Sequence, residues 1–253
     1  IKIHKPITST QRFKKSMFLL KFSKPNKLFK IFFKNCAGRN NKGHVTVFSK
    51  GSRKKLNTMP TTYPTRWDDK LITVVSIIRN KKKLSMICKH ITGSLSIRPF
   101  VLGVSIGQKT FSSNLPKKFW VNNLPGGFVI LKFLPRYSIF SNLFIKNLCK
   151  YALANGTYCQ VLEIFTDFNL IKVTLPSKQV KIVSGWNFVM LGRNSKQDHR
   201  FNILGKAGTN IVFGIKPKVR GVARNPVDHP HGGRTKTNQP EVSIWGWVAK
   251  RNK

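Results

Sequence analysis

The chain has 253 residues, which is enough for one large domain or two small ones. Its 47 Lys and Arg face only 7 Asp and Glu, which gives a formal net charge of +40. A free compact protein with this imbalance would repel itself strongly, so the composition predicts a polyanionic partner. No stretch approaches the roughly 18 uninterrupted apolar residues of a membrane-spanning helix, which argues against that class.

The four cysteines, Cys36, Cys88, Cys149 and Cys159, form no CxxC pair and no dense framework. We interpret them as free thiols in a reducing compartment, and not as zinc ligands or disulfides. The chain is rich in Phe, Ile, Lys and Asn, a bias that an AT-rich genome produces. This composition indicates an organelle-encoded product.

Residues 1–55 form a predicted basic N-terminal arm that contains none of the seven acids. Within it, residues 16–35 (SMFLLKFSKPNKLFKIFFKN) mix Phe and Leu with Lys at short intervals. One interpretation is an amphipathic segment on a membrane or an import signal. The other is an arm threaded into RNA, with Lys on phosphates and Phe on bases. Lys lies on nearly every side of the segment, which favours the RNA arm.

The arm ends in GRNNKGHVTVFSKGSRKK, residues 38–55. Gly38 and Gly43 bracket four polar or basic residues, so the backbone can turn sharply and approach phosphates closely. The plain alternative is a solvated basic loop. We predict that this stretch binds an anionic partner through Arg39, Asn40, Asn41, Lys42 and His44.

Residues 56–125 contain three β-branched, partly alternating runs at residues 71–80, 82–93 and 94–104. Short strands separated by polar or glycine-containing turns predict a small barrel or sandwich.

Residues 126–195 contain a second series of strands that follows a Pro-Gly-Gly turn. In one of these strands, Ile171, Val173 and Leu175 alternate with Lys172 and Thr174, which is typical of a strand with one wet face. The pattern suits an SH3-like barrel.

Residues 196–253 form a predicted extended tail around the segment 216–236, KPKVRGVARNPVDHPHGGRTK. Pro226, Pro230, Gly232 and Gly233 forbid a regular helix or central strand there. The segment carries six basic residues and one acid, so we expect it to take its shape against an anionic partner. A long irregular tail of this kind would be unusual for a free enzyme.

Asp228, His229 and His231 are the one cluster that could carry enzymatic chemistry. A zinc site needs three or four donors, and no second ligand pair lies nearby. A general base at His229 needs a nucleophile and an oxyanion site, and neither is visible. We favour a structural interpretation, in which Asp228 orders the turn and both imidazoles bind or stack on RNA.

Several of these stretches resemble the universal L2 family of large-subunit ribosomal proteins. GVARNPVDHPHGGR (221–234) is similar to the family signature, and GRNN at 38–41 resembles a second motif. LGKAG (204–208) and the Trp-Gly close EVSIWGWVAKRNK (241–253) resemble the family too. The resemblance implies an OB-like barrel at 56–125, an SH3-like barrel at 126–195, and rRNA-binding extensions. It also associates the histidine loop with the peptidyl transferase activity of the subunit, whose chemistry belongs to rRNA.

The chain departs from the family pattern at three places. SKGSRKK replaces a Gly- and His-rich run after GRNN, and YSIFSNLFIKNL at 137–148 is apolar where the family carries more Gly and Arg. The histidine loop also lacks a third glycine and an acid before its arginine. A protein neighbour is therefore an alternative to rRNA at the altered apolar loop.

We therefore expect a mainly β, non-enzymatic constituent of the large ribosomal subunit that supports assembly, subunit association and the peptidyl transferase region. The expected partners are large-subunit rRNA, neighbouring ribosomal proteins and small-subunit rRNA at the subunit interface. No cofactor, small-molecule substrate or membrane is expected, apart from structural Mg²⁺ on the rRNA. The predicted rRNA-binding residues are Arg39, Asn40, Asn41, Lys42, His44, Lys216, Lys218, Arg220, Arg224, Asn225, Asp228, His229, His231, Gly232, Gly233, Arg234 and Lys236.

Two rivals from other classes stay open at this point. A metal-dependent RNA-processing enzyme on an RNA-binding barrel would need clustered carboxylates, and the seven acids are scattered. A membrane-surface protein would use the Phe- and Lys-rich arm. For the ribosomal interpretation, composition favours a mitochondrial matrix ribosome, with a plastid ribosome as the alternative.

Overall fold

The computed structural model describes residues 2–16, 27–33, 35–51, 56–62, 70–80, 83–113, 124–146, 148–233 and 241–248. The chain divides into two compact units, each built from two stretches of sequence. The sheet unit comprises Ile1–Phe33 and Asn57–Gly205, and the loop unit comprises Lys34–Leu56 and Lys206–Lys253. The predicted domain boundaries at residues 55, 125 and 195 stay a prediction.

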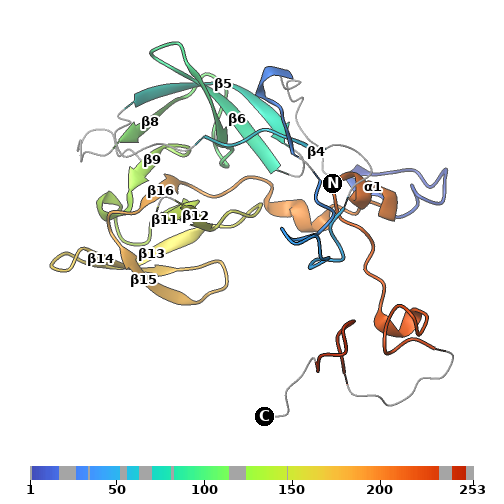
Figure 1. Cartoon of the computed structure of the whole chain (residues 1–253). Helices are drawn as coiled ribbons and strands as arrows, with labels where there is room; N and C mark the ends of the chain where they lie inside the picture. Colours follow the sequence, from blue (N-terminus) through green and yellow to red (C-terminus); the bar gives the residue numbers. More distant parts are fainter. Residues whose placement is uncertain are drawn as a thin grey trace. The chain divides into compact units, whose positions relative to one another are not determined.

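A ten-stranded sheet dominates the sheet unit. In spatial order, its strands are β15 (Val180–Ser184), β14 (Leu170–Thr174), β13 (Cys159–Phe165), β10 (Ile139–Ser141), β16 (Phe188–Leu191), β9 (Phe128–Ile130), β8 (Lys109–Ser113), β5 (Lys70–Asn80), β6 (Lys83–His90) and β7 (Leu95–Pro99). The β8–β9 pairing is parallel, and the other pairings are antiparallel. Figure 1 shows β5, β6 and β8 at one side of this unit, β13–β15 at the other, and β9 and β16 between them.

The first half of the sheet forms because β-branched and apolar residues fill long strands. Ile72, Val74 and Ile78 of β5 are buried, and β6 is buried along five consecutive residues. A register shift between Val74 and Ser76 bends β5. Such bending helps a sheet to curl around a core, as in small barrels.

The second half of the sheet shows the alternation that its sequence predicts. Ile171 and Val173 are buried in β14, while Lys172 between them stays partly exposed. They join Phe140 and Val161 in a second core, in which burial of apolar surface supplies the main stabilisation. The predicted mainly β class is confirmed, and the two halves are consistent with the OB-like and SH3-like barrels.

Shorter elements complete the described chain. They are β1 (Lys2–Ile3), β2 (Lys15–Ser16), η1 (Lys27–Phe29), β3 (Ile31–Phe33), β4 (Leu56–Thr58), η2 (Leu131–Phe133), β11 (Leu143–Ile145), β12 (Leu148–Tyr151), η3 (Gln197–Phe201), α1 (Ala207–Val212) and η4 (Gly221–Ala223). Lys15 and Ile203 exchange two backbone hydrogen bonds of 3.0 Å, so the start of the chain pairs with the stretch that follows the sheet. In the described parts, no helix has the length and apolar character to cross a membrane.

The predicted Phe- and Lys-rich arm lies largely outside the described residues, since residues 17–26 are not among them. The choice between an RNA arm and a membrane-surface segment is therefore not addressed by the structure. It stays a prediction.

Candidate nucleic-acid interface

The GRNN stretch forms a closed turn in the loop unit. Asn40 accepts a hydrogen bond from the His44 backbone N–H through its side-chain oxygen, at 2.9 Å, and its own N–H donates to the His44 carbonyl, also at 2.9 Å. Asn40 therefore shapes the turn, while Arg39, Asn41 and Lys42 are exposed around it. A turn of this kind holds two cations on a short, fixed backbone.

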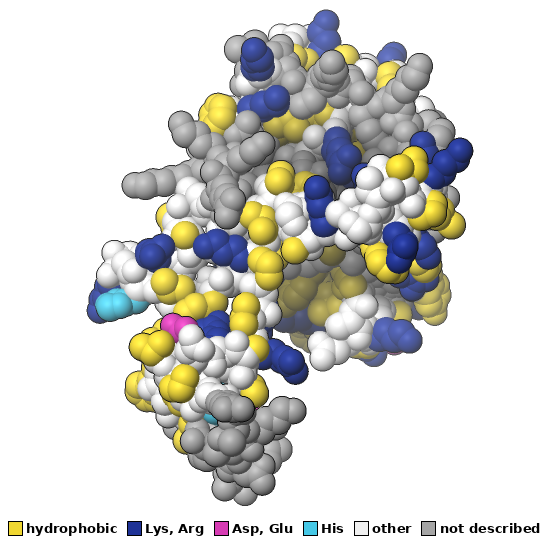
Figure 2. Space-filling view, turned by 90° about the vertical axis from the view of Figure 1, so that its right-hand side faces the viewer, with side chains coloured by type: hydrophobic (Ala, Val, Ile, Leu, Met, Phe, Trp, Pro, Cys, Tyr) yellow, Lys and Arg dark blue, Asp and Glu magenta, His cyan; other side chains and the backbone are white. Residues whose placement is uncertain are grey.

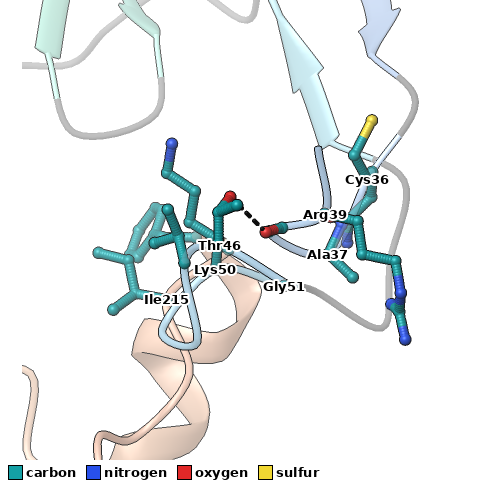
Figure 3. A pocket seen from close by; sticks show the side chains of 12 residues that line it. Cys36, Ala37, Arg39, Thr46, Lys50, Gly51 and Ile215 are labelled. Atoms are coloured by element: carbon teal, nitrogen blue, oxygen red, sulfur yellow. Dashed lines mark hydrogen bonds between the residues drawn. The ribbon is translucent and has the colours of Figure 1, made fainter. Parts of the chain in front are cut away.

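Gly38 is required at the base of this turn. It has a φ of +78°, and an added Cβ would collide with the Val47 carbonyl. The Gly38 carbonyl accepts hydrogen bonds from the Thr46 N–H at 2.9 Å and from the Thr46 hydroxyl at 3.2 Å (Figure 3). The glycine that the sequence analysis assigned to close phosphate approach thus also has a packing role.

Backbone pairing joins this turn to the beginning of the basic tail. The Gly51 N–H donates to the Gly214 carbonyl at 3.0 Å, and the Lys216 N–H donates to the Ser49 carbonyl at 2.8 Å. Two motifs that are far apart in the sequence therefore belong to one compact unit. Their basic residues can meet the same partner.

A cavity of about 450 Å³ lies where these segments pair. Figure 3 shows Ile215 and Lys50 on one side of it, and Cys36 and Arg39 on the other. The other lining residues are Asn35, Ala37, Gly38, Thr46, Val47, Gly51, Phe213 and Gly214. Apolar side chains and backbone make up most of its lining, and such walls can hold the face of a base.

Phe48 follows one of the stretches that resemble the L2 family and contacts two others, and the sequence analysis did not single it out. Its ring centroid lies 5.6 Å from that of Trp245 in the C-terminal stretch. The Arg224 guanidinium lies 5.9 Å from the Phe48 ring centroid on its face. An aromatic residue directly after a basic, glycine-bracketed turn was the available signal, but only the fold brings its partners to it.

The histidine loop is built from tight turns. The Asp228 and His229 N–H groups donate to the Asn225 carbonyl at 3.0 and 3.2 Å, and the Gly232 N–H donates to the His229 carbonyl at 2.8 Å. An added Cβ at Gly232 would collide with the backbone of Asn225. Backbone hydrogen bonds hold this turn, and the predicted ordering role of the Asp228 side chain stays a prediction.

The two imidazoles lie against each other, with ring centroids 4.8 Å apart. His229 Nδ1 accepts the His231 backbone N–H at 3.0 Å, and His231 Nε2 accepts the Val242 N–H at 3.2 Å. The neutral His229 ring therefore carries its proton on Nε2, which makes Nε2 a hydrogen-bond donor.

The pKa of His229 lies below its ordinary value of 6.5. Partial burial is the first cause, followed by the positive potential of His231 and of Arg224. All of these favour the neutral ring. A neutral imidazole that donates through Nε2 suits a phosphate, ribose or base acceptor, but it adds no full charge.

The remaining predicted site residues lie on the surface of the loop unit or outside the described residues. Lys216, Lys218, Arg220, Asn225, Asp228 and Gly233 are exposed, and Arg224 is half-buried. Arg234 and Lys236 fall outside the described residues. In Figure 2, Lys and Arg side chains are spread over the visible face, whereas acidic side chains are scarce.

The metal-enzyme alternative gains no support from the described part of the chain. Across those residues, no group of three or more His, Cys, Asp or Glu is placed to hold a metal ion. Asp228, His229 and His231 are engaged in loop turns and backbone hydrogen bonds.

Comparisons with known proteins agree with these features. The family profile for "Ribosomal Proteins L2, C-terminal domain" matches residues 125–246. The large ribosomal subunit protein uL2m of Paramecium tetraurelia is 33% identical over 232 residues, which cover 86% of this chain and 88% of the relative. The large ribosomal subunit protein uL2 of Karelsulcia muelleri is 31% identical over 244 residues, which cover 92% of this chain and 86% of the relative. The uL2 of a Wolbachia from Brugia malayi is 29% identical over 260 residues, which cover 100% of this chain and 93% of the relative. The chain belongs to the uL2 family of large ribosomal subunit proteins.

Proposed function

We propose that this protein is a structural constituent of the large ribosomal subunit and that it binds rRNA mainly through the loop unit. One observation carries the proposal. The GRNN turn and the histidine loop, far apart in the sequence, fold into one unit with exposed cations around glycine-shaped turns. Family membership supplies the ribosomal context.

The binding mechanism follows from charge and backbone shape. Arg39, Lys42, Lys218 and Arg220 are exposed and can neutralise phosphates that would repel one another where RNA helices converge. The turns held by glycines place these cations on narrow backbone segments that fit between RNA strands. This arrangement positions rRNA and performs no chemistry.

The histidine loop contributes a hydrogen-bond donor of fixed direction more than positive charge. His229 is fixed through Nδ1 and donates from Nε2, so it recognises an acceptor at a defined position. We propose that the loop supports the peptidyl transferase region by holding rRNA there. We also propose that the protein supports subunit assembly and contacts small-subunit rRNA at the subunit interface.

We propose that the ribosome concerned is mitochondrial. The Phe-, Ile-, Lys- and Asn-rich composition and the similarity to a uL2m support this placement, although bacterial uL2 proteins are similar as well. Fractionation of cells tests it directly. We expect the protein in the mitochondrial fraction, and recovery with plastid ribosomes would contradict the placement.

Sedimentation tests the function itself. On a sucrose gradient at low salt, the protein should migrate with large subunits, and ribonuclease digestion should move it away from that position. High salt should release it steeply, because each neutralised phosphate contributes about 0.7–0.9 to the slope of log K against log salt. A protein that stays at the top of the low-salt gradient would contradict the proposal.

A further inference from the structure

The outward face of strands β13–β15 carries four exposed apolar side chains. We define it by Phe165, Leu170, Val180 and Ile182, whose exposed fractions are 39%, 37%, 51% and 56%. Phe168 and Trp186, in the turns beside it, are exposed as well. Exposed apolar residues that cluster on one face mark a binding surface more often than isolated ones do.

Strand register places these side chains on the same face. Phe165 lies opposite Leu170, and Ile182 lies opposite Lys172. Because side chains alternate between the faces of a strand, Ile171 and Val183 point the other way, and both are buried in the core. The outward face therefore presents two apolar pairs that the core does not use, Phe165 with Leu170 and Val180 with Ile182. Polar residues of the same face, the Glu163–Lys172 pair and Thr174, lie between them.

This face carries no net positive charge, although the chain as a whole carries +40. Lys172 Nζ lies 3.2 Å from Glu163 Oε2, which neutralises the lysine on this face. Lys181 points to the opposite face, where it hydrogen-bonds the Tyr151 hydroxyl at 2.8 Å. Asp167 in the turn between β13 and β14 is balanced by the exposed Lys178 in the turn between β14 and β15. A phosphate backbone would find no excess cation here.

Strand β15 is also the terminal strand of the ten-stranded sheet. Proteins commonly protect such an edge with charged side chains. β15 has Lys181 on its other face but presents the exposed Val180 and Ile182 on the outward face. An extended polypeptide can pair with an open edge and place alternate side chains on the adjoining apolar face. Backbone pairing and apolar contact are complementary to a protein, and not to a polyanion.

We propose that the outward face of β13–β15 binds an extended apolar segment of a neighbouring protein, laid along β15, and does not bind rRNA. The inference rests on the proposed function, since the neighbour is another protein of the large subunit. It assigns the two units different partners: the loop unit contacts rRNA and the β15 edge contacts protein.

Photo-crosslinking in assembled large subunits tests the proposal. The full chain would carry p-benzoylphenylalanine in place of Ile182, or of Val219 in the basic tail as the control. We expect the Ile182 probe to give adducts with another polypeptide and the Val219 probe to give adducts with rRNA. Ile182 adducts with rRNA, with peptides of this chain, or no adduct at all would overturn the proposal. If the chain fails to enter subunits, the proposed function fails instead.

A second test introduces charge on this face and measures whether the neighbouring protein is retained. The variant Val180→Lys with Ile182→Lys places two cations on the apolar face, and both positions are exposed, so the fold should persist. We expect subunits with this variant to lose the protein found by crosslinking, with an affinity weakened about tenfold or more. Val219→Lys, the same change in the tail, should retain that protein. Equal retention by both variants would contradict the proposal, provided that their melting temperatures match the parent.

Discussion

The sheet unit and the loop unit differ in what holds them together. Phe128, Phe140 and Leu143 of the sheet unit are completely buried. In the described part of the loop unit, Gly51 is the one residue that is buried. The loop unit is instead held by hydrogen bonds within turns, by ring contacts around Phe48, and by glycines that pack closely against neighbouring backbone. The first unit is stabilised by buried apolar surface, and the second is held mainly by local turns and contacts.

Truncation of a side chain in the core of the sheet unit tests this difference most strongly. Phe140→Ala removes a fully buried ring, so we expect a loss of about 3–5 kcal/mol in the free energy of unfolding. Denaturant unfolding of the purified chain at high salt measures it. Phe168→Ala, at an exposed ring, is the matched control and should change stability little. Equal effects would mean that the sheet core is not the stabilising element.

A substitution that collides with the backbone of the histidine loop should destabilise the loop unit and leave the sheet unit unchanged. Gly232→Ala forces a methyl group against the Asn225 backbone, which should destabilise the loop by about 1–3 kcal/mol. We expect weaker retention on large subunits at rising salt, with the melting of the sheet unit unchanged. Gly208→Ala, where an added Cβ meets nothing within 4 Å, should behave as the parent. A changed sheet melting temperature would argue against separate units.

Removing the His229 ring should have a smaller effect that depends on pH. His229→Ala removes the acceptor of the His231 N–H, so it should impair subunit assembly or peptide-bond formation while the sheet stays folded. Because the folded pKa is lowered, the His229 contribution to loop stability is full above pH about 6.5 and is lost as the pH falls through the folded pKa.

NMR titration of the purified chain measures the His229 pKa, and gradient profiles measure the subunits. Val227→Ala, at an exposed residue of the same loop, provides the control. Normal levels of active subunits in His229→Ala, or a His229 pKa above 6.5, would contradict this prediction.

The smallest effect concerns a single exposed cation. Arg220→Ala should lower the magnitude of the log K against log salt slope by about 1, because one phosphate contact is lost. Binding of the chain to large-subunit rRNA at a series of salt concentrations measures the slope. Lys181→Ala, at a lysine bound to Tyr151, should leave the slope unchanged. An unchanged slope in Arg220→Ala would remove this residue from the interface.

Local patterns predicted some of the strands but not β10 and β11, where the structure buries Phe140 and Leu143 of the predicted apolar loop in the core. The alternation of Ile171 and Val173 with Lys172 appeared as predicted, because side chains on a strand must point to opposite faces. The mainly β class and the membership in the uL2 family could also be predicted from short motifs. Local patterns did not predict the continuous sheet through β8 and β9, because a parallel pairing depends on long-range contacts.

The candidate site was predicted only as a set of residues. Sequence alone indicated the basic turns, the glycines and the histidine loop, since their composition rules out a buried core. It did not indicate that Asn40 closes a turn, that His229 accepts from His231, or that Phe48 lies between Arg224 and Trp245. These contacts depend on where distant segments meet.

Sequence by itself determined the charge of this protein, its strand-forming runs and its family, because composition and local spacing are properties of the chain. Tertiary structure alone decided that residues 49–51 pair with residues 214–216 and so unite two motifs. It also decided that Val180 and Ile182 of β15 share one face with the Lys172–Glu163 ion pair. The physical reason is that register and long-range pairing select among many arrangements that the same local pattern allows.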